Sequence, residues 1–193
     1  MNPYFGDNPA TLTIAIVTVL TWVVLERVQD FRHRGGGKRQ DRGSYLLLVF
    51  CILATGVVAL LSTTVPSLTV GGQPVPFVVG VVLAWGGIVL RAASFRALGR
   101  YFTFHVETRP HQPVIATGPY RVLRHPSYTG LWLTLVGLAL MCGTWVAVVA
   151  AVLLPGIGLA VRIRVEERAL EAELGEAYRA FAATRKRLIP FVW

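Results

Sequence analysis

The sequence of 193 residues is 54% hydrophobic and only 15% charged, whereas soluble globular domains average about 25% charged residues. This composition excludes an ordinary soluble domain, and the length allows one compact domain, which we expect to be a single membrane domain spanning residues 1–193. The formal net charge of +9 does not indicate nucleic-acid binding, because every basic residue lies in one of three clusters between or after apolar stretches.

Five apolar stretches follow one another along the chain, at residues 10–25, 45–65, 75–90, 128–142 and 145–161. A helix needs about 17–25 residues to cross the hydrocarbon core of a bilayer. The second stretch meets this length easily, and local thinning of the bilayer or flanking polar side chains can accommodate the shorter ones. The sequence therefore predicts an all-α polytopic membrane protein with about five transmembrane helices, and four helices are the main alternative.

The basic residues alternate between the two sides of this predicted membrane domain. Residues 26–44 hold six of them, residues 91–127 hold six and residues 162–187 hold seven, which together are all 19 in the chain. Residues 1–9, the connection 66–76 and the turn 142–144 hold none. Because basic loops stay in the cytoplasm, we expect an external amino terminus, a cytoplasmic carboxyl terminus and anionic membrane lipids as partners.

Residues 1–9 also lack the positive region of a secretory signal, so we expect no cleavable signal peptide. The run Gly35–Gly37 before Lys38 lacks the GxxxxGK[ST] spacing of a phosphate-binding loop and predicts a flexible linker. Cys51 and Cys142 have no partner at metal-ligand spacing and are predicted to pack in the apolar regions.

Residues 162–187 predict an amphipathic helix in which Gly175 is a weak point. Its apolar stripe consists of Leu170, Leu174, Tyr178 and Phe181. We expect this stripe to pack against the domain or the membrane surface rather than to line a cofactor site.

Several enzyme classes find no support in the sequence. It contains no HExxH, CxxC or GxSxG, and no GxGxxG that follows a strand. The four histidines do not form a metal-ligand set with the few acidic residues: His33, His105, His111 and His125. We therefore expect no metal site, no triad hydrolysis and no Rossmann-type cofactor binding.

Polar residues suited to chemistry gather in two segments, 101–128 and 162–178. The three-residue turn 142–144 joins the fourth and fifth apolar stretches as a tight hairpin, which returns the chain to the same face. The two polar segments are therefore predicted to be neighbours in space.

Residues 118–130 read GPYRVLRHPSYTG and continue directly into the fourth apolar stretch. Pro126 suits the first turn of a helix, where free backbone N–H groups can bind an anion. Arginine, histidine and tyrosine are also ordinary anchors at a membrane interface. The residues alone leave both interpretations open.

This segment resembles the signature of the isoprenylcysteine carboxyl methyltransferase family and its phospholipid methyltransferase relatives. A second block, from Arg162 through Glu166 and Tyr178 to Pro190, is similar to the same family's carboxyl-terminal motif. The resemblance covers about residues 95–190, and two blocks at matching spacing around a hairpin make it specific. It implies a cytoplasmic pocket for S-adenosylmethionine formed by the last two membrane helices and the tail. Residues 75–193 would then be the catalytic core, and residues 1–66 would add the first two spans.

The resemblance also implies roles for individual residues. Glu166 matches the family's cofactor-binding glutamate, and Arg162 matches its substrate-carboxylate arginine, the residue to which we assign the catalytic role. Glu107 stands where the eukaryotic members have a cofactor-contacting glutamine. The full set of implied cofactor-binding residues is Glu107, Val114, Ile115, Tyr120, His125, Pro126, Ser127, Tyr128 and Glu166. One position departs from the family pattern: Gln112 stands where a histidine is usual and His111 lies one residue earlier, which leaves the role of His111 open.

The implied chemistry suits these residues. Methyl transfer from a sulfonium is an in-line displacement that needs positioning and no metal. A carboxylate acceptor is deprotonated at neutral pH and needs only a guanidinium to orient it. Arg162 and Glu166 are spaced i and i+4 and share a helix face, although a simple salt bridge between them is an alternative.

We therefore expect a methyltransferase for a lipid-like or prenylcysteine-like carboxylate. One alternative is methylation of a phospholipid amine, which needs a base, with Glu107 and His111 as candidates. The other is a non-catalytic scaffold or small transporter that binds no cofactor. Against a transporter, the five apolar stretches contain almost no charged residue.

Overall fold

The computed structural model describes residues 8–32, 38–39, 41, 43–71, 74–104, 107–108 and 113–190. Within them, the α-helices are α1 (Pro9–Arg32), α2 (Ser44–Ser62), α3 (Val75–Leu98), α4 (Pro126–Cys142), α5 (Trp145–Leu174) and α6 (Glu176–Ala183). Short 3-10 helices span Pro66–Leu68, Gly99–Tyr101 and Gly118–Arg121. Two-residue strands, β1 (Lys38–Arg39) and β2 (Glu107–Thr108), pair in an antiparallel manner.

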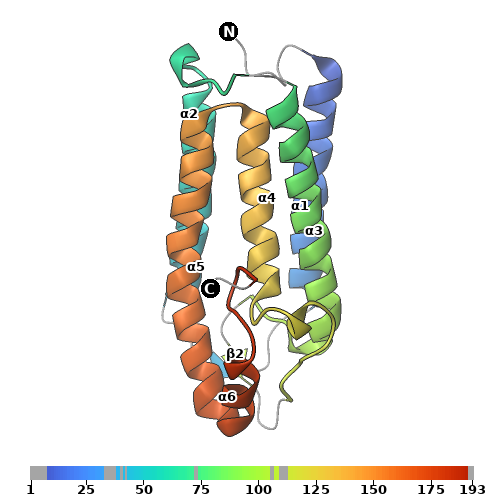
Figure 1. Ribbon diagram of the computed structural model, residues 1–193, viewed down its shortest axis with the longest axis vertical. Coiled ribbons are helices and arrows are strands. Elements are labelled where there is room, and N and C mark those ends of the chain that lie inside the picture. Colours follow the sequence, from blue (N-terminus) through green and yellow to red (C-terminus); the bar gives the residue numbers. More distant parts are fainter. Residues whose placement is uncertain are drawn as a thin grey trace.

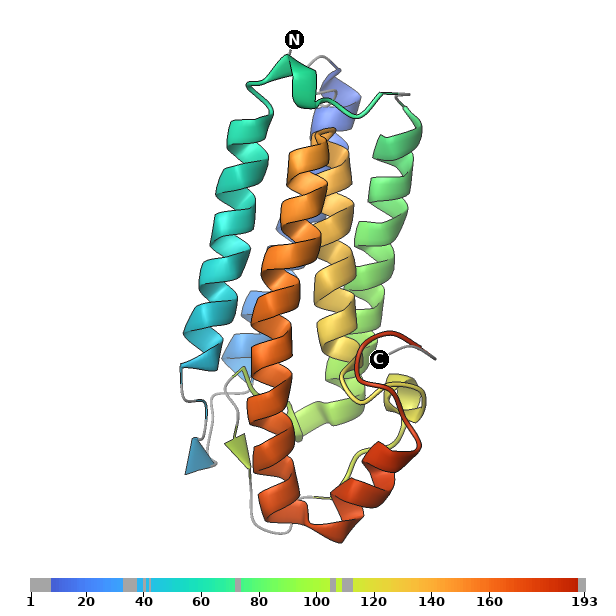
Figure 2. The same ribbon diagram turned by 60° about the vertical axis from the view of Figure 1, so that its left-hand side comes forward.

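The five long helices, α1 to α5, lie side by side along the long axis of the molecule (Figures 1 and 2). The α2–α3 connection and the α4–α5 turn lie at one end of this bundle. Helix α6, the two strands and the described residues between Gly99 and Arg121 lie at the other end. The polar segments of the sequence are thus collected at a single end of the bundle.

Four helical segments are long and apolar enough to cross a membrane: Pro9–Phe31, Ser44–Ser62, Val75–Tyr101 and Trp145–Leu174. Helix α4 is also apolar, but its 17 residues stand at the lower limit for a span. Large apolar side chains face outward, and Phe50 and Leu60 are 68% and 71% exposed, as expected for surfaces that contact lipid. The protein is an integral membrane protein, and helices occur at all five predicted positions.

At the polar end of the bundle, α1, α3 and α5 continue into the polar residues that flank the shorter apolar stretches, as expected. Helix α1 continues past residue 25 to Arg32, α3 past residue 90 to Leu98, and α5 past residue 161 to Leu174. The apolar stretches end at the first charged residues, but helical hydrogen bonding does not. Charge marks where the hydrocarbon region ends and does not mark where a helix ends.

The single tail helix predicted for residues 162–187 is wrong. Residues 162–174 complete α5, and Gly175 then adopts a φ of 55° before α6 begins at Glu176. Glycine reaches positive φ without the steric cost that a Cβ imposes, so it ends helices readily. The break turns α6 back toward the bundle (Figure 2).

Helices α3 and α4 meet along a seam of glycines, Gly80 and Gly87 on α3 with Gly130 and Gly137 on α4. A Cβ on Gly87 would lie 2.5 Å from the Gly130 carbonyl oxygen and 2.6 Å from the backbone nitrogen of Thr134. Small residues allow backbones to approach closely where no hydrophobic effect drives helices together. This seam holds α4 in the centre of the bundle.

The close approach predicts a position-specific loss of stability. Gly87→Ala is expected to destabilise the fold by about 1–3 kcal/mol, because backbone atoms must move to make room. Gly86→Ala is the matched control, since a Cβ at this exposed neighbour meets nothing within 4 Å. Thermal unfolding of both variants in detergent measures the difference. Equal midpoints would contradict the close packing of the seam.

The predicted hairpin between α4 and α5 is confirmed. Gly143 turns with a φ of 75°, and Thr144 caps α5 by accepting a hydrogen bond from the Ala147 N–H at 3.3 Å. At the other end of the two helices, Arg124 Nη1 donates to Glu167 Oε1 at 2.9 Å. The two polar segments are therefore neighbours, as the turn length predicts.

A cluster of buried apolar residues ties this arrangement together. It draws on α2, α4, α5 and the tail, and comprises Leu48, Leu131, Leu135, Leu159, Ile163 and Leu188. Leu188 is 1% exposed, so the tail beyond α6 is packed into the bundle rather than left at its surface.

Candidate active site

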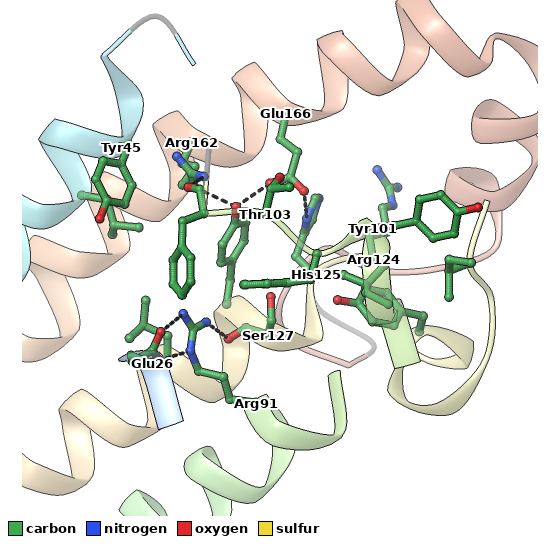
Figure 3. Close-up of a pocket in the computed structure, with 18 of the residues that line it drawn as sticks. Glu26, Tyr45, Arg91, Tyr101, Thr103, Arg124, His125, Ser127, Arg162 and Glu166 are labelled. Carbon is green, nitrogen blue, oxygen red and sulfur yellow. Dashed lines mark hydrogen bonds and ion pairs between the residues drawn. The ribbon is translucent and has the colours of Figure 1, made fainter. Parts of the chain in front are cut away.

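A cavity of about 370 Å³ lies at the polar end of the bundle and is lined by residues from all six helices. This volume is in the range of about 300–1,000 Å³ that small-molecule sites occupy. Helices α1 and α2 contribute apolar residues to the wall, namely Trp22, Val23, Leu48, Val49, Ile52 and Leu53, and α1 also contributes the charged residues Glu26, Arg27 and Asp30. Figure 3 shows charged and aromatic side chains from several helices around the cavity.

The structure brings most of the predicted site residues to this one cavity. Its lining includes Val114, Ile115, Tyr120, His125, Ser127, Tyr128, Arg162 and Glu166. Pro126 is fully buried in the first turn of α4 and does not line the cavity. The backbone of Glu107 belongs to β2, whereas its side chain, like all of His111 and Gln112, lies outside the described residues.

Glu166 and Arg162 of α5 are joined through the hydroxyl group of Tyr128 on α4. This hydroxyl donates to Glu166 Oε2 at 2.5 Å and accepts from Arg162 Nε at 2.8 Å. The His125 ring stacks on Tyr128, with centroids 5.5 Å apart, and its Nδ1 lies 3.9 Å from Glu166 Oε1. The Glu166 side chain is 27% exposed, so its carboxylate remains accessible from the cavity (Figure 3).

Arg162 is held on all sides by the protein. Its side chain is 3% exposed, and Nη1 donates to Asp41 Oδ1 at 3.2 Å. Nη2 donates to the Phe104 carbonyl oxygen. Each of the three guanidinium nitrogens therefore already has an acceptor. Asp41, which precedes α2, is a contributor to the site that no local motif indicated.

Glu167 is a second residue that sequence analysis missed. Its Oε1 accepts from Arg124 at 2.9 Å and lies 3.4 Å from His125 Nε2, while Arg187 Nη2 lies 2.8 Å from its Oε2. The hydrogen bond from Arg187 to Glu167 raises the pKa of that guanidinium above its ordinary value. Glu167 thus anchors the tail against the segment that carries His125.

Arg91 and Glu26 form a buried ion pair between α3 and α1. The Arg91 side chain, 6% exposed, donates from Nε and Nη2 to the Glu26 carboxylate. Its Nη1 donates to the Ser127 carbonyl oxygen at 2.8 Å (Figure 3). Both residues lie just beyond the apolar stretches, in parts of α1 and α3 that the stretches do not cover, and the stretches themselves hold no charged residue.

The apolar stripe of the tail lines the cavity, which corrects the expectation that it only packs. Leu170 and Leu174 of α5 and Tyr178 and Phe181 of α6 all contribute to the wall. Gly175 makes this possible, because it folds α6 over the opening of the bundle.

The Tyr178 hydroxyl is a buried polar group available to a ligand. The residue is 3% exposed, and within the described part of the chain this hydroxyl is the buried side-chain oxygen without a hydrogen-bond partner. Burial, with the nearby charges of Glu167 and Glu166, raises the pKa of Tyr178 above its ordinary value. Burial and Glu166 likewise raise the pKa of Tyr120. Both phenols are therefore neutral donors at physiological pH.

Among the residues that the structure describes, no group of three or more His, Cys, Asp or Glu side chains is arranged to hold a metal ion.

Residues 75–177 match the family described as phospholipid methyltransferase, which is more than half of the chain. The chain belongs to this family. The predicted family resemblance is thereby confirmed, and the matched range contains α3, α4, α5 and the two sequence blocks up to Ala177.

Curated relatives support the same placement. Protein-S-isoprenylcysteine O-methyltransferases B and A of Arabidopsis thaliana are 30% and 31% identical over 115 residues, which cover 58% of this chain and 58% of each relative. The uncharacterized protein YpbQ of Bacillus subtilis is 24% identical over 121 residues, 62% of this chain and 72% of that protein. The matches therefore span less than two thirds of the plant relatives' length.

A solved structure shares the fold. It is that of the eukaryotic intramembrane Ras methyltransferase, an isoprenylcysteine carboxyl methyltransferase, with a TM-score of 0.64 and 23% sequence identity. The match covers 75% of this chain and 52% of that chain. The arrangement of membrane helices is therefore common to both proteins.

Proposed function

We propose that this protein is an S-adenosylmethionine-dependent membrane methyltransferase that methylates a carboxylate of a lipid-like or prenylcysteine-like acceptor. The observation that carries the proposal is the connection of Arg162 and Glu166 through Tyr128 within a cavity to which α1 and α2 contribute apolar residues. The printed names of the plant relatives, which are isoprenylcysteine O-methyltransferases, agree with it.

The residues present fit the cofactor. Glu166 offers an accessible carboxylate to the ammonium group of the methionine moiety. The unpaired hydroxyl of Tyr178 offers a hydrogen bond to a polar ligand atom. Val114, Ile115 and Tyr120 add apolar and aromatic surface to the same cavity. When bound, S-adenosylmethionine supplies a methyl carbon that the acceptor oxygen attacks as the carbon–sulfur bond breaks, and the electron pair stays on sulfur.

Arg162 is the residue we assign to orient the acceptor carboxylate. A carboxylate is ionised at neutral pH, so its oxygen is a ready nucleophile and the site needs no general base. Trp22 and Ile52 are among the apolar residues of the wall and Tyr45 lies against Arg162, with its ring centroid 5.8 Å from the guanidinium carbon. This wall would hold the lipid part of the acceptor between the membrane helices.

Methyl transfer with tritiated S-adenosylmethionine and purified protein tests the function. Farnesylcysteine, a fatty acid and phosphatidylethanolamine are offered separately as acceptors. We expect labelled product with farnesylcysteine or the fatty acid, and we expect mild base to release the label as methanol because esters hydrolyse. Absence of transfer and of cofactor binding would instead support a scaffold or transporter.

The second candidate is methylation of a phospholipid amine. The observation that favours it is that every guanidinium nitrogen of Arg162 already donates to the protein. This reaction would need a base, and the candidates named for that role, Glu107 and His111, lie outside the described side chains. Base-stable label on phosphatidylethanolamine would identify it.

We further propose that the cavity faces the cytoplasm, because the described residues of the three basic segments lie at that end of the bundle. In a background of Cys51→Ser and Cys142→Ser, Gly71→Cys and Glu176→Cys place thiols at exposed positions at opposite ends of the bundle. In intact cells a membrane-impermeant maleimide should label position 71 and not position 176. The reverse pattern would overturn the orientation.

A further inference from the structure

We propose that Asp41 determines acceptor specificity: its carboxylate occupies, on Arg162, the place that an acceptor carboxylate must take. Acceptor binding would then be an exchange of one carboxylate for another on a single guanidinium. This inference rests on the proposed function, since it assigns a carboxylate ligand to Arg162. Asp41 lies outside the range 75–177 that matches the family.

The first step is the saturation of Arg162. Its Nε donates to the Tyr128 hydroxyl and its Nη2 to the Phe104 carbonyl, and both of these acceptors are neutral. Its Nη1 donates to Asp41 Oδ1 at 3.2 Å and lies 3.5 Å from Ser44 Oγ. Asp41 is therefore the charged partner with which an incoming carboxylate competes.

The second step is burial. The side chains of Arg162 and Asp41 are only 3% and 5% exposed, so water screens their interaction weakly. A second carboxylate beside Asp41 would be repelled by a like charge at short range. Arg162 cannot bind an acceptor carboxylate at full strength while Asp41 stays in contact with it.

The third step shows why exchange is feasible. Asp41 Oδ1 also accepts a hydrogen bond from Ser44 Oγ at 2.6 Å and from the Tyr45 N–H at 3.0 Å. These donors belong to the first turn of α2, whose N-terminal end favours a negative charge. If Nη1 of Arg162 turns away from Asp41, the Asp41 Oδ1 atom stays in place with these two hydrogen bonds and is not left as an isolated buried charge.

The exchange also gives the site a different affinity for the acceptor and for the product. A carboxylate acceptor carries the charge that can replace Asp41, whereas its methyl ester is neutral and cannot. Once the ester forms, the contact between Arg162 and Asp41 can form again, which favours release of the product. The site would thus discriminate by charge between two ligands that share the same lipid chain.

The test compares binding of farnesylcysteine and of its methyl ester to the full-length protein in nanodiscs, measured by calorimetry. Asp41→Asn removes the competing charge and keeps an oxygen acceptor for Ser44 and Tyr45. We expect the variant to bind the carboxylate about five-fold or more tightly than wild type. Affinity for the ester should stay within roughly two-fold, because a neutral ligand does not compete with Asp41.

Further variants separate charge from structure. Asp41→Ser is a second neutral replacement, which removes the carboxylate altogether. Asp41→Glu restores the charge and should return the carboxylate affinity toward the wild-type value. Glu176→Gln is the control, since Glu176 pairs with the exposed Arg179 and does not line the cavity. It should leave the ratio of the two affinities unchanged.

If both neutral variants bind the carboxylate more weakly, or change both ligands equally, Asp41 only positions Arg162 and the proposal is overturned. The readout is binding, so it does not depend on turnover. A changed affinity ratio without methyl transfer would uphold the exchange and refute the proposed function. Methyl transfer with an unchanged affinity ratio would support the proposed function and refute the exchange.

Discussion

Replacement of Arg162 by lysine is expected to lower turnover well over tenfold while cofactor affinity stays within a few-fold, because lysine lacks the planar fork of donors. In the structure this fork reaches Tyr128, Asp41 and the Phe104 carbonyl from three different nitrogens. A single ammonium group cannot reach all three acceptors at once. The substitution would therefore disturb the geometry of the site and lower its affinity for an acceptor carboxylate.

Single-turnover methyl transfer and calorimetric titration of the cofactor measure the two quantities. Arg168→Lys is the matched control, since Arg168 is an exposed arginine of the same helix. Near-normal turnover in Arg162→Lys would defeat the carboxylate assignment. The assignment would also fail if Arg162→Lys lost as much cofactor affinity as we expect for Glu166→Ala. Amine methylation would then be the better interpretation.

Replacement of Glu166 by alanine is expected to weaken binding of S-adenosylmethionine by about ten- to one-hundred-fold, because a hydrogen bond to a charged group contributes about 1.5–3 kcal/mol. Its carboxylate faces the cavity and is in contact with Tyr128 and close to His125. Glu166→Gln keeps an acceptor for the Tyr128 hydroxyl but loses the charge, so an intermediate loss is expected.

Calorimetry on folded protein measures these affinities, with Glu173→Ala as the control because Glu173 is exposed on the same helix. Thermal unfolding of each variant shows whether the fold survives the loss of the Tyr128 contact. Unchanged cofactor affinity in stable Glu166→Ala protein would remove the basis for assigning this cavity to the cofactor.

The parts of the fold that were predictable have local causes. Runs of apolar residues indicated the five long helices, four of which are long and apolar enough to cross a membrane, because a bilayer requires a minimum length of hydrophobic helix. The short turn at Gly143 predicted the hairpin, and with it the proximity of the segments around His125 and Glu166. The family resemblance rested on these same segments, and most of the residues that it implicated line one cavity.

The helix ends were not predictable to the same degree. The third apolar stretch ends before Arg91, yet α3 continues to Leu98, and Glu26 of α1 pairs with Arg91 inside the protein. The sequence predicted Tyr178 on an apolar stripe that packs against the domain. In the structure this stripe lines the cavity, because Gly175 redirects the chain. A positive φ at one glycine is a backbone state that helical periodicity does not reveal.

The sequence by itself determined that this is a membrane protein, in what order its helices follow, and which segments carry the family's motifs. Only the tertiary structure decided how the charges pair. Asp41 and Arg162 are separated by 121 residues, and Glu26 and Arg91 by 65. Such pairs leave no periodic or local signal, because each side chain obtains its partner only after separate helices have packed. The pairing of Arg162 with Asp41 is therefore set only in the folded bundle, and the proposed mode of acceptor binding depends on this pairing.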